Sequence, residues 1–194
     1  MKITAIGLQH FRNIAGARLE FAGRLQFLVG ANGQGKTNLL EAAGFVTALR
    51  SFRSTDQSSL IQQGEREAAI VADLDHEQEG ESQLKVVFKP GSKQAWLDGQ
   101  RVTRLADIIG KFPTVVFSSQ DQQLVRGAPA GRRRWLDMTL SATDATYLTH
   151  LQSYHRALAA RNTLLKRGAS PAEFEAFESV LAEHGFDLVV RRRD

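Results

Sequence analysis

The 194-residue sequence is 42% hydrophobic and 24% charged, which is typical of a globular protein with one large domain or one and a half smaller ones. It has no cysteine, which excludes disulfides and thiolate metal sites, and its net charge of +4 permits contact with nucleic acid without requiring it. No apolar run approaches the roughly 18 residues of a membrane span, and the first residues lack the apolar core of a signal peptide, so we expect a cytoplasmic protein without membrane contact.

Three short strands are predicted before residue 30. Apolar and polar side chains alternate along residues 2–9 and again along 17–21, a pattern typical of strands with one buried face. Residues 25–29 are mostly apolar, which predicts a buried strand. A helix is then predicted over residues 37–49. Its expected apolar face consists of Leu39, Leu40, Ala43, Val46 and Leu49.

Residues 30–37, between that strand and that helix, fit the phosphate-binding pattern G-x-x-x-x-G-K-[ST]. Glycines allow a sharp turn that brings backbone N–H groups onto phosphate oxygens, and the N-terminus of the following helix favours negative charge. Lys36 supplies a positive charge to the same oxygens, and the Thr37 hydroxyl can ligate Mg²⁺. We therefore predict a bound nucleoside triphosphate. Its predicted binding residues are Gly30, Ala31, Asn32, Gly33, Gln34, Gly35, Lys36 and Thr37.

A block of antiparallel strands is predicted further along the chain. Strand patterns cover residues 68–74, 84–89 and 94–97, and Asp98-Gly99 is a hairpin signal before a return strand at 101–102. Small nucleotide kinases usually alternate strands with helices, so this block argues against that class. The elements expected next are a short helix, a buried strand and a polar loop, over residues 105–109, 114–117 and 118–123.

From residue 130 on, the patterns are helical. We expect a helix around Trp135, a long helix over 144–167 closed by Gly168, and a third helix opened by a capping box at residues 170–173. The apolar stripe expected on the third helix is Phe174, Phe177, Leu181 and Leu188. That helix stops in mid-pattern, which indicates an N-terminal fragment. The predicted domains are a nucleotide-binding lobe, residues 1–127, and an incomplete helical arm, residues 128–194.

The five histidines show no H-x-x-x-H spacing, so a dedicated metal cage is not expected. His150 and His155 lie on the predicted long helix, where we interpret them as packing or surface residues rather than ligands.

Asp73 is the local match to the second motif of P-loop enzymes, in which four apolar residues precede a magnesium-binding Asp. Leu74 follows it in place of the frequent Glu. Asp73 could serve a self-contained small phosphotransferase, but the neighbouring hairpin patterns favour an antiparallel strand with Asp73 at its solvated end. The chain is therefore expected to bind a nucleotide without hydrolysing it, and we assign no catalytic residue.

Several motifs together resemble the RecF family of bacterial recombination proteins, which are relatives of SMC-type ATPase heads. The resemblance covers essentially the whole chain. Its most selective part is the P-x-x-R-R-x-x-L-D block at residues 129–137, in which the double arginine falls on Arg132 and Arg133. The other parts are Phe11-Arg12-Asn13-Ile14, residues 27–42, Phe52-Arg53-Ser54, Asp98-Gly99 and Arg161-Asn162.

The resemblance implies an α/β fold, namely a P-loop lobe of an ABC- and SMC-type ATPase head with an antiparallel β subdomain, followed by an α-helical arm. It implies ATP and Mg²⁺ as cofactors and duplex or gapped DNA as a partner. It also implies roles in DNA replication, repair, recombination and the SOS response, with recombinase loading at gaps assisted by RecO and RecR. In such heads two subunits sandwich ATP through motifs that this sequence lacks, so an ATP-dependent homodimer and hydrolysis are expected only of a longer protein. Another SMC-like head with a structural role is the alternative.

The resemblance also suggests individual site residues. Gln120 occupies the place of a loop glutamine that contacts Mg²⁺, although the register among residues 120–122 stays open and a solvated connector is the alternative. Arg132 and Arg133 could contact DNA phosphates, or an arginine there could pair with Asp137. Arg12 lies either beside the nucleotide or on the surface.

Overall fold

The computed structural model describes residues 1–54, 56–77, 80–168 and 170–193, and the chain divides into two compact units, Met1–Ser118 and Ser119–Asp194. The domain boundary expected after residue 127 stays a prediction. The residues just before it form two short helices, η3 (Ser119–Asp121) and α2 (Gln122–Arg126). Arg132 of the next helix donates hydrogen bonds to the carbonyl oxygens of Leu124 and Gly127, over 3.3 and 3.0 Å, which joins α2 to that helix.

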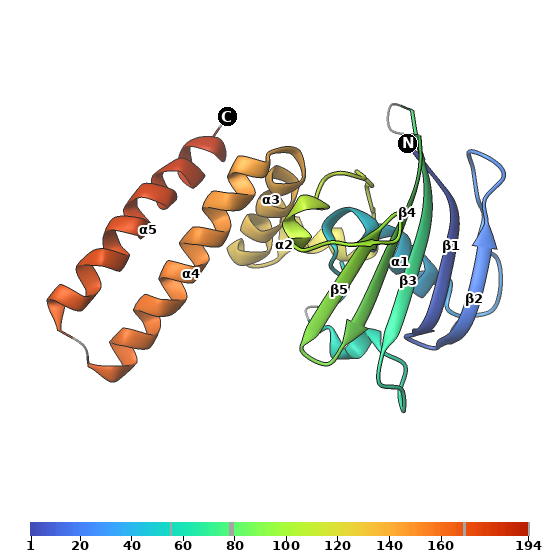
Figure 1. Ribbon diagram of the computed structural model, residues 1–194, viewed down its shortest axis with the longest axis horizontal. Coiled ribbons are helices and arrows are strands. Elements are labelled where there is room, and N and C mark those ends of the chain that lie inside the picture. The colour runs from blue at the N-terminus through green and yellow to red at the C-terminus, as the bar shows by residue number, and fades with distance from the viewer. Residues whose placement is uncertain (55, 78–79, 169, 194) are drawn as a thin grey trace. The chain divides into compact units, whose positions relative to one another are not determined.

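The first unit is built on a six-stranded antiparallel sheet with the order β2-β1-β3-β4-β5-β6 (Figure 1). The strands are β1 (Lys2–Phe11), β2 (Ile14–Glu20), β3 (Ala68–His76), β4 (Gly80–Lys89), β5 (Ser92–Leu97) and β6 (Gln100–Arg101). The predicted antiparallel block is thus confirmed. Asp98 and Gly99 form the turn between β5 and β6 with φ values of 51° and 77°, the left-handed conformation that an Asp-Gly hairpin turn requires.

The core of this unit lies between the sheet and helix α1 (Lys36–Ala48). Alternate residues of β3 and β4 are buried, as the period-2 pattern predicts. Phe45 of α1 packs edge-on against Phe88 of β4 with ring centroids 4.8 Å apart. Leu40 does not belong to the buried face, because its side chain is 54% exposed. The buried face consists instead of Leu39, Ala42, Phe45 and Val46, followed by Leu49.

Two predicted buried strands are wrong. Residues 25–29 and 114–117 form no strand, and both segments turn large apolar side chains to solvent. The exposed side chains are Leu25, Phe27, Val29, Val115 and Phe117. A strand becomes buried only when neighbours pair with it and cover it, and no described strand pairs with either segment. The helix expected over residues 105–109 is a shorter 3-10 turn, η2 (Leu105–Asp107).

The second unit is helical. After α2 come α3 (Pro129–Thr143), α4 (Ala145–Arg167) and α5 (Pro171–Arg191), and α4 and α5 pack against each other as a hairpin (Figure 1). Gly168 ends α4 in the left-handed conformation, and the capping box of Ser170 and Glu173 opens α5, so both signals are confirmed. None of the helices in the described residues combines the length and apolar character that crossing a bilayer requires.

Candidate functional site

The glycine-rich loop leads directly into α1. Gly33 and Gly35 have φ values of 84° and 94°, which bulky residues rarely adopt, and Gly35 caps the helix. A Cβ atom on Gly35 would lie 3.1 Å from both the Asn13 Oδ1 atom and the Ile14 side chain. Glycine at position 35 therefore serves both the backbone turn and the close approach of the β1–β2 hairpin.

The β1–β2 hairpin holds the loop in place. Phe11 pairs with Ile14, so Arg12 and Asn13 form the turn, and Arg12 has a positive φ of 57°. The Asn13 side-chain amide donates to the Gly33 carbonyl over 2.6 Å and accepts from Asn38 over 2.7 Å. One asparagine thus joins the sheet, the loop and α1.

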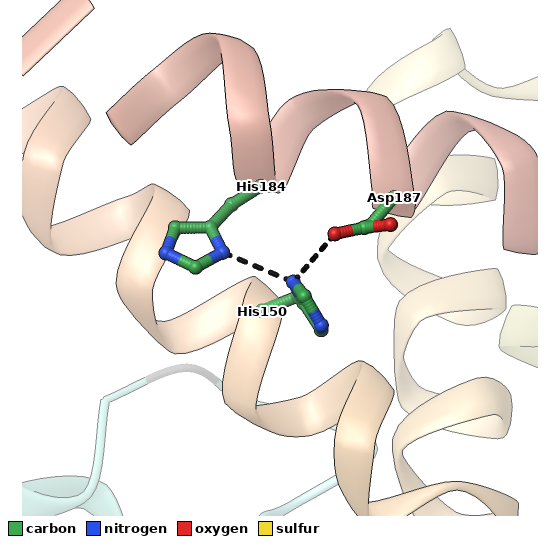
Figure 2. Close-up of side chains that lie close together, drawn as sticks. All are labelled: His150, His184 and Asp187. Carbon is green, nitrogen blue, oxygen red and sulfur yellow. Dashed lines mark hydrogen bonds and ion pairs between the residues drawn. The ribbon is translucent and has the colours of Figure 1, made fainter. Parts of the chain in front are cut away.

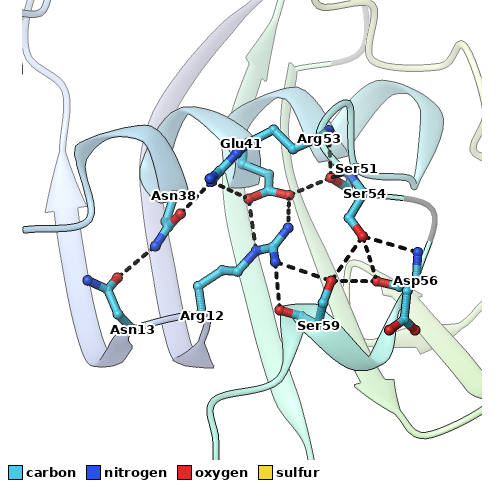
Figure 3. A network of polar contacts seen from close by, with 9 residues as sticks. All are labelled: Arg12, Asn13, Asn38, Glu41, Ser51, Arg53, Ser54, Asp56 and Ser59. Carbon is cyan, nitrogen blue, oxygen red and sulfur yellow. Dashed lines mark hydrogen bonds and ion pairs between the residues drawn. The ribbon is translucent and has the colours of Figure 1, made fainter. Parts of the chain in front are cut away.

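Glu41 is the centre of a polar network beside the loop (Figure 3). Its side chain is fully buried in α1. Arg12 binds it with two hydrogen bonds of 2.6 and 3.1 Å, and Arg53 donates a third over 3.1 Å. The Ser51 hydroxyl donates to it as well. A buried carboxylate is tolerated here because cations and donors surround it.

The network extends through Ser59 to a short turn, η1 (Ser58–Leu60). Arg12 also donates to the Ser59 carbonyl oxygen over 2.8 Å. Asp56 accepts from the Ser58 hydroxyl and backbone amide, and these two bonds hold the pKa of Asp56 below its ordinary value. Sequence reasoning gave Glu41 no role. A single carboxylate next to the apolar positions of the predicted helix was the available signal.

Lys36 lies at the first position of α1, with its ammonium group folded over the loop. Its Nζ atom donates to the carbonyl oxygens of Gly30 and Ala31 over 2.6 and 2.7 Å. The next residue, Thr37, is exposed. A cation and a hydroxyl therefore stand side by side at the N-terminal end of a helix, where the backbone also favours anions.

These residues line a cavity of about 730 Å³. Five of the eight predicted loop residues are in its lining, namely Asn32, Gly33, Gly35, Lys36 and Thr37. The lining does not include Gly30, Ala31 or Gln34. The carbonyl oxygens of Gly30 and Ala31 nevertheless accept hydrogen bonds from Lys36. Arg12 and Arg53 join Lys36 in the lining, and the lining residues that the structure describes include no carboxylate. The cavity offers cations and hydrogen-bond donors, a chemistry suited to a polyphosphate.

Asp73 is placed elsewhere. It lies in the antiparallel strand β3, where its carboxylate accepts from Arg18 and from Gln83, each over 2.8 Å. Partial burial acts to raise the pKa of Asp73, but the hydrogen bonds from Gln83 and Arg18 outweigh it and lower the pKa. Asp73 is not among the described residues of the cavity lining, so the geometry favours the structural interpretation of this residue.

The remaining predicted site residues belong to the second unit. Gln120 is exposed in η3, and Arg132 and Arg133 are exposed in α3. The suggested pairing of these arginines with Asp137 is wrong. Asp137 instead accepts from Arg192 over 2.7 Å and from the Tyr147 hydroxyl. Burial and the hydrogen bond to Asp137 raise the pKa of Tyr147 to about 12.

Comparisons with known proteins agree with this geometry. Residues 2–157 match the family described as the RecF/RecN/SMC N terminal domain. The chain is 36% identical over 191 residues to the DNA replication and repair protein RecF of Exiguobacterium sp. (strain ATCC BAA-1283 / AT1b). It is 39% identical over 201 residues to the protein of that name from Nostoc punctiforme (strain ATCC 29133 / PCC 73102). These matches cover 98% and 100% of the chain but only 51% and 54% of the relatives, so the chain spans about half their length.

Solved structures of two kinds of protein are similar to this chain. A structure of the recombination mediator protein RecF with ATP, from the RecFOR pathway, matches 98% of this chain and 52% of its own with a TM-score of 0.93 and 31% identity. The Smc head domain of Pyrococcus furiosus matches 96% of this chain with a TM-score of 0.55 and 24% identity, a likeness of fold alone. The predicted fold class, an ABC- and SMC-type head with an antiparallel subdomain, is confirmed.

Proposed function

Because the chain belongs to the RecF/RecN/SMC N-terminal domain family, we propose that it is the ATP-binding portion of a RecF-type DNA replication and repair protein. The observation that carries this proposal is the position of Lys36 over the loop, in a cavity that also contains Arg12 and Arg53. A triphosphate brings several negative charges to one place. Lys36, the helix N-terminus and the positive charge that Arg12 and Arg53 together keep beyond their shared partner Glu41 all attract it. The similar RecF structure with ATP supports the choice of nucleotide.

In this proposal the loop residues bind the phosphates, and Lys36 exchanges its two carbonyl partners for phosphate oxygens. Mg²⁺ fits the site, since this ion commonly takes one protein oxygen together with phosphate oxygens and water, and the Thr37 hydroxyl is exposed at the cavity. The ion would screen the charge of the phosphates. The Mg²⁺ role of Gln120, which is exposed in η3 of the second unit, stays a prediction from the resemblance. Arg12 and Arg53 are fixed by Glu41 and hold positive charge at the cavity wall.

Duplex or gapped DNA is the proposed macromolecular partner. Arg132 and Arg133 are proposed to contact its phosphate groups. For the longer protein that the relatives represent, we propose ATP-dependent dimerisation, ATP hydrolysis, cooperation with RecO and RecR in recombinase loading, and a part in the SOS response. A self-contained phosphotransferase would need Asp73 as its magnesium ligand. The Asp73 carboxylate instead accepts hydrogen bonds from Arg18 and Gln83, which disfavours that class of enzyme.

Titration calorimetry with ATP and Mg²⁺ tests the proposal. The substitution Lys36→Ala removes a charged donor, so we expect a loss of affinity of about 10-fold or more, to the point of undetectable binding. Lys89→Ala is the matched control, because Lys89 is exposed on β4 and pairs with Glu67 over 3.2 Å. Equal ATP affinity in both variants would contradict the proposal, provided that circular dichroism shows both to be folded.

A further inference from the structure

Two histidines and an aspartate converge between α4 and α5 (Figure 2). His150 comes from α4, and His184 and Asp187 lie one turn apart on α5. The His150 Nδ1 atom is 3.0 Å from the His184 Nδ1 atom and 3.1 Å from Asp187 Oδ2. One ligand atom from each residue lies within 4.8 Å of the other two. Three possible metal-ligand atoms therefore lie close together.

Protons alone satisfy this arrangement poorly. A ring N–H points in one direction, and the contact of His150 Nδ1 with His184 has hydrogen-bond geometry whereas its contact with Asp187 is an ion pair, so one proton on His150 Nδ1 does not serve both neighbours. A proton on His184 Nδ1 instead leaves the lone pair of His150 facing the carboxylate over 3.1 Å. Protons on both Nδ1 atoms would face each other. A divalent cation would accept all three lone pairs at once.

The dimensions suit a transition metal. Bonds of about 2.0–2.2 Å to nitrogen and oxygen place neighbouring ligand atoms of a tetrahedral zinc site about 3.3–3.5 Å apart. The two observed separations are slightly shorter than this edge, so small side-chain shifts would admit the ion. Imidazole with carboxylate favours Zn²⁺ and its neighbours over Mg²⁺, which prefers oxygen ligands.

The surroundings hold the three residues in place. The side chains of His150 and Asp187 are 20% and 38% exposed, so the group is half-buried yet open to an ion. A Cβ atom on Gly185 would be 3.3 Å from the Tyr154 ring, so the two helices approach closely beside His184. Leu188, next to Asp187, is buried. The site needs no rearrangement of the helices to form.

We propose that His150, His184 and Asp187 form a binding site for Zn²⁺ or a chemically similar transition-metal ion, which fastens α4 to α5. Water completes the coordination. Histidine spacing along one helix gave no sign of the site, because His150 and His184 are 34 residues apart in the chain. The site lies in the second unit and is independent of the proposed nucleotide function.

Metal titration of the untagged, chelator-treated protein tests the proposal. We expect one Zn²⁺ per chain, a rise in Tm on Zn²⁺ addition, and an intense tetrahedral d–d spectrum with Co²⁺, all unaffected by excess Mg²⁺. His184→Gln and Asp187→Asn should each weaken Zn²⁺ binding by about 10-fold or more, since even loss of an outer partner costs 10–100-fold.

His155→Gln is the matched control, because His155 is exposed on α4 and is not part of the cluster. It should bind Zn²⁺ as the parent protein does. Circular dichroism without metal checks that each variant is folded. Stoichiometric Zn²⁺ binding that disappears in the two ligand variants alone supports the site. No Zn²⁺ binding by the parent protein, or equal binding by all variants, overturns it and leaves the cluster as a hydrogen-bonded contact.

Discussion

Glu41 shows how much one buried residue contributes to the site. Its carboxylate is fully buried, whereas the Arg12 and Arg53 side chains that bind it are 18% and 34% exposed. The arginines therefore reach from the interior to the cavity, and the carboxylate fixes their positions. Arg12 is also held in a left-handed conformation that costs about 1–2 kcal/mol for an L-residue, so the network must offset that cost.

The substitution Glu41→Gln tests this role. It preserves the size of the side chain but leaves two guanidinium groups without their counter-ion, and we expect the free energy of unfolding to fall by about 3 kcal/mol. ATP affinity should fall as well, because the arginines lose their fixed positions. Denaturant titration and calorimetry measure the two effects. Glu67→Gln, which breaks an exposed pair with Lys89, should cost less than about 1 kcal/mol. Equal costs for the two variants would contradict the assigned role of Glu41.

Lys93 is a half-buried cation in the first unit. Its Nζ atom donates to the Leu49 carbonyl and lies 5.4 Å from the centre of the Phe45 ring. Burial, with a smaller contribution from the charge of Arg50, lowers the pKa of Lys93 to about 8 from its ordinary 10.5. Between these two pH values the unfolded chain binds more protons at this residue than the folded chain does.

Stability should therefore rise with pH in this window. As the pH increases from about 8 to 10.5, we expect the free energy of unfolding of the parent protein to increase relative to that of Lys93→Met. The difference should be constant below pH 8, where Lys93 is charged in both states. Urea titrations at several pH values provide the measurement. If the curves for Lys93→Met and the parent protein ran parallel across this pH window, the effect would be disproved.

At the scale of elements, local signals predicted most of the fold. Alternation predicted β3 and β4, the Asp98-Gly99 dipeptide predicted the last hairpin, and the capping box at Ser170 predicted the start of α5. Each of these signals acts within a few residues. From local patterns, the site itself was predictable only as far as the glycine-rich loop. The resemblance suggested one further residue, Arg12, which lies in the cavity lining.

The failures share a physical cause, since each depends on contacts between distant parts of the chain. Residues 25–29 and 114–117 have the apolar composition of buried strands, but composition does not show whether partner strands are present. Glu41 became part of the site through Arg12, which is 29 residues away. The His150 cluster depends in the same way on the pairing of α4 with α5.

At the scale of the whole molecule, the net charge of +4 is compatible with attraction to DNA but does not locate a contact. Arg132 and Arg133, which are exposed on α3, are the proposed contacts with DNA phosphates. They differ in the hydrogen bonds that they make within the protein. Arg132 already donates to two backbone carbonyls, so part of its donor capacity is used within the protein. Arg133 lies on the next position of the helix and is exposed.

The salt dependence of DNA binding separates a phosphate contact from a general charge effect. If Arg133 contacts one phosphate, Arg133→Gln should reduce the slope of log K against log salt by about 1, because one fewer counter-ion is released. Anisotropy of a labelled duplex over a series of salt concentrations measures this slope. Arg101→Gln on β6 removes the same charge from an exposed position and should leave the slope nearly unchanged. If both substitutions changed the slope equally, net charge alone would account for the binding, and α3 would lose its assigned role at the DNA.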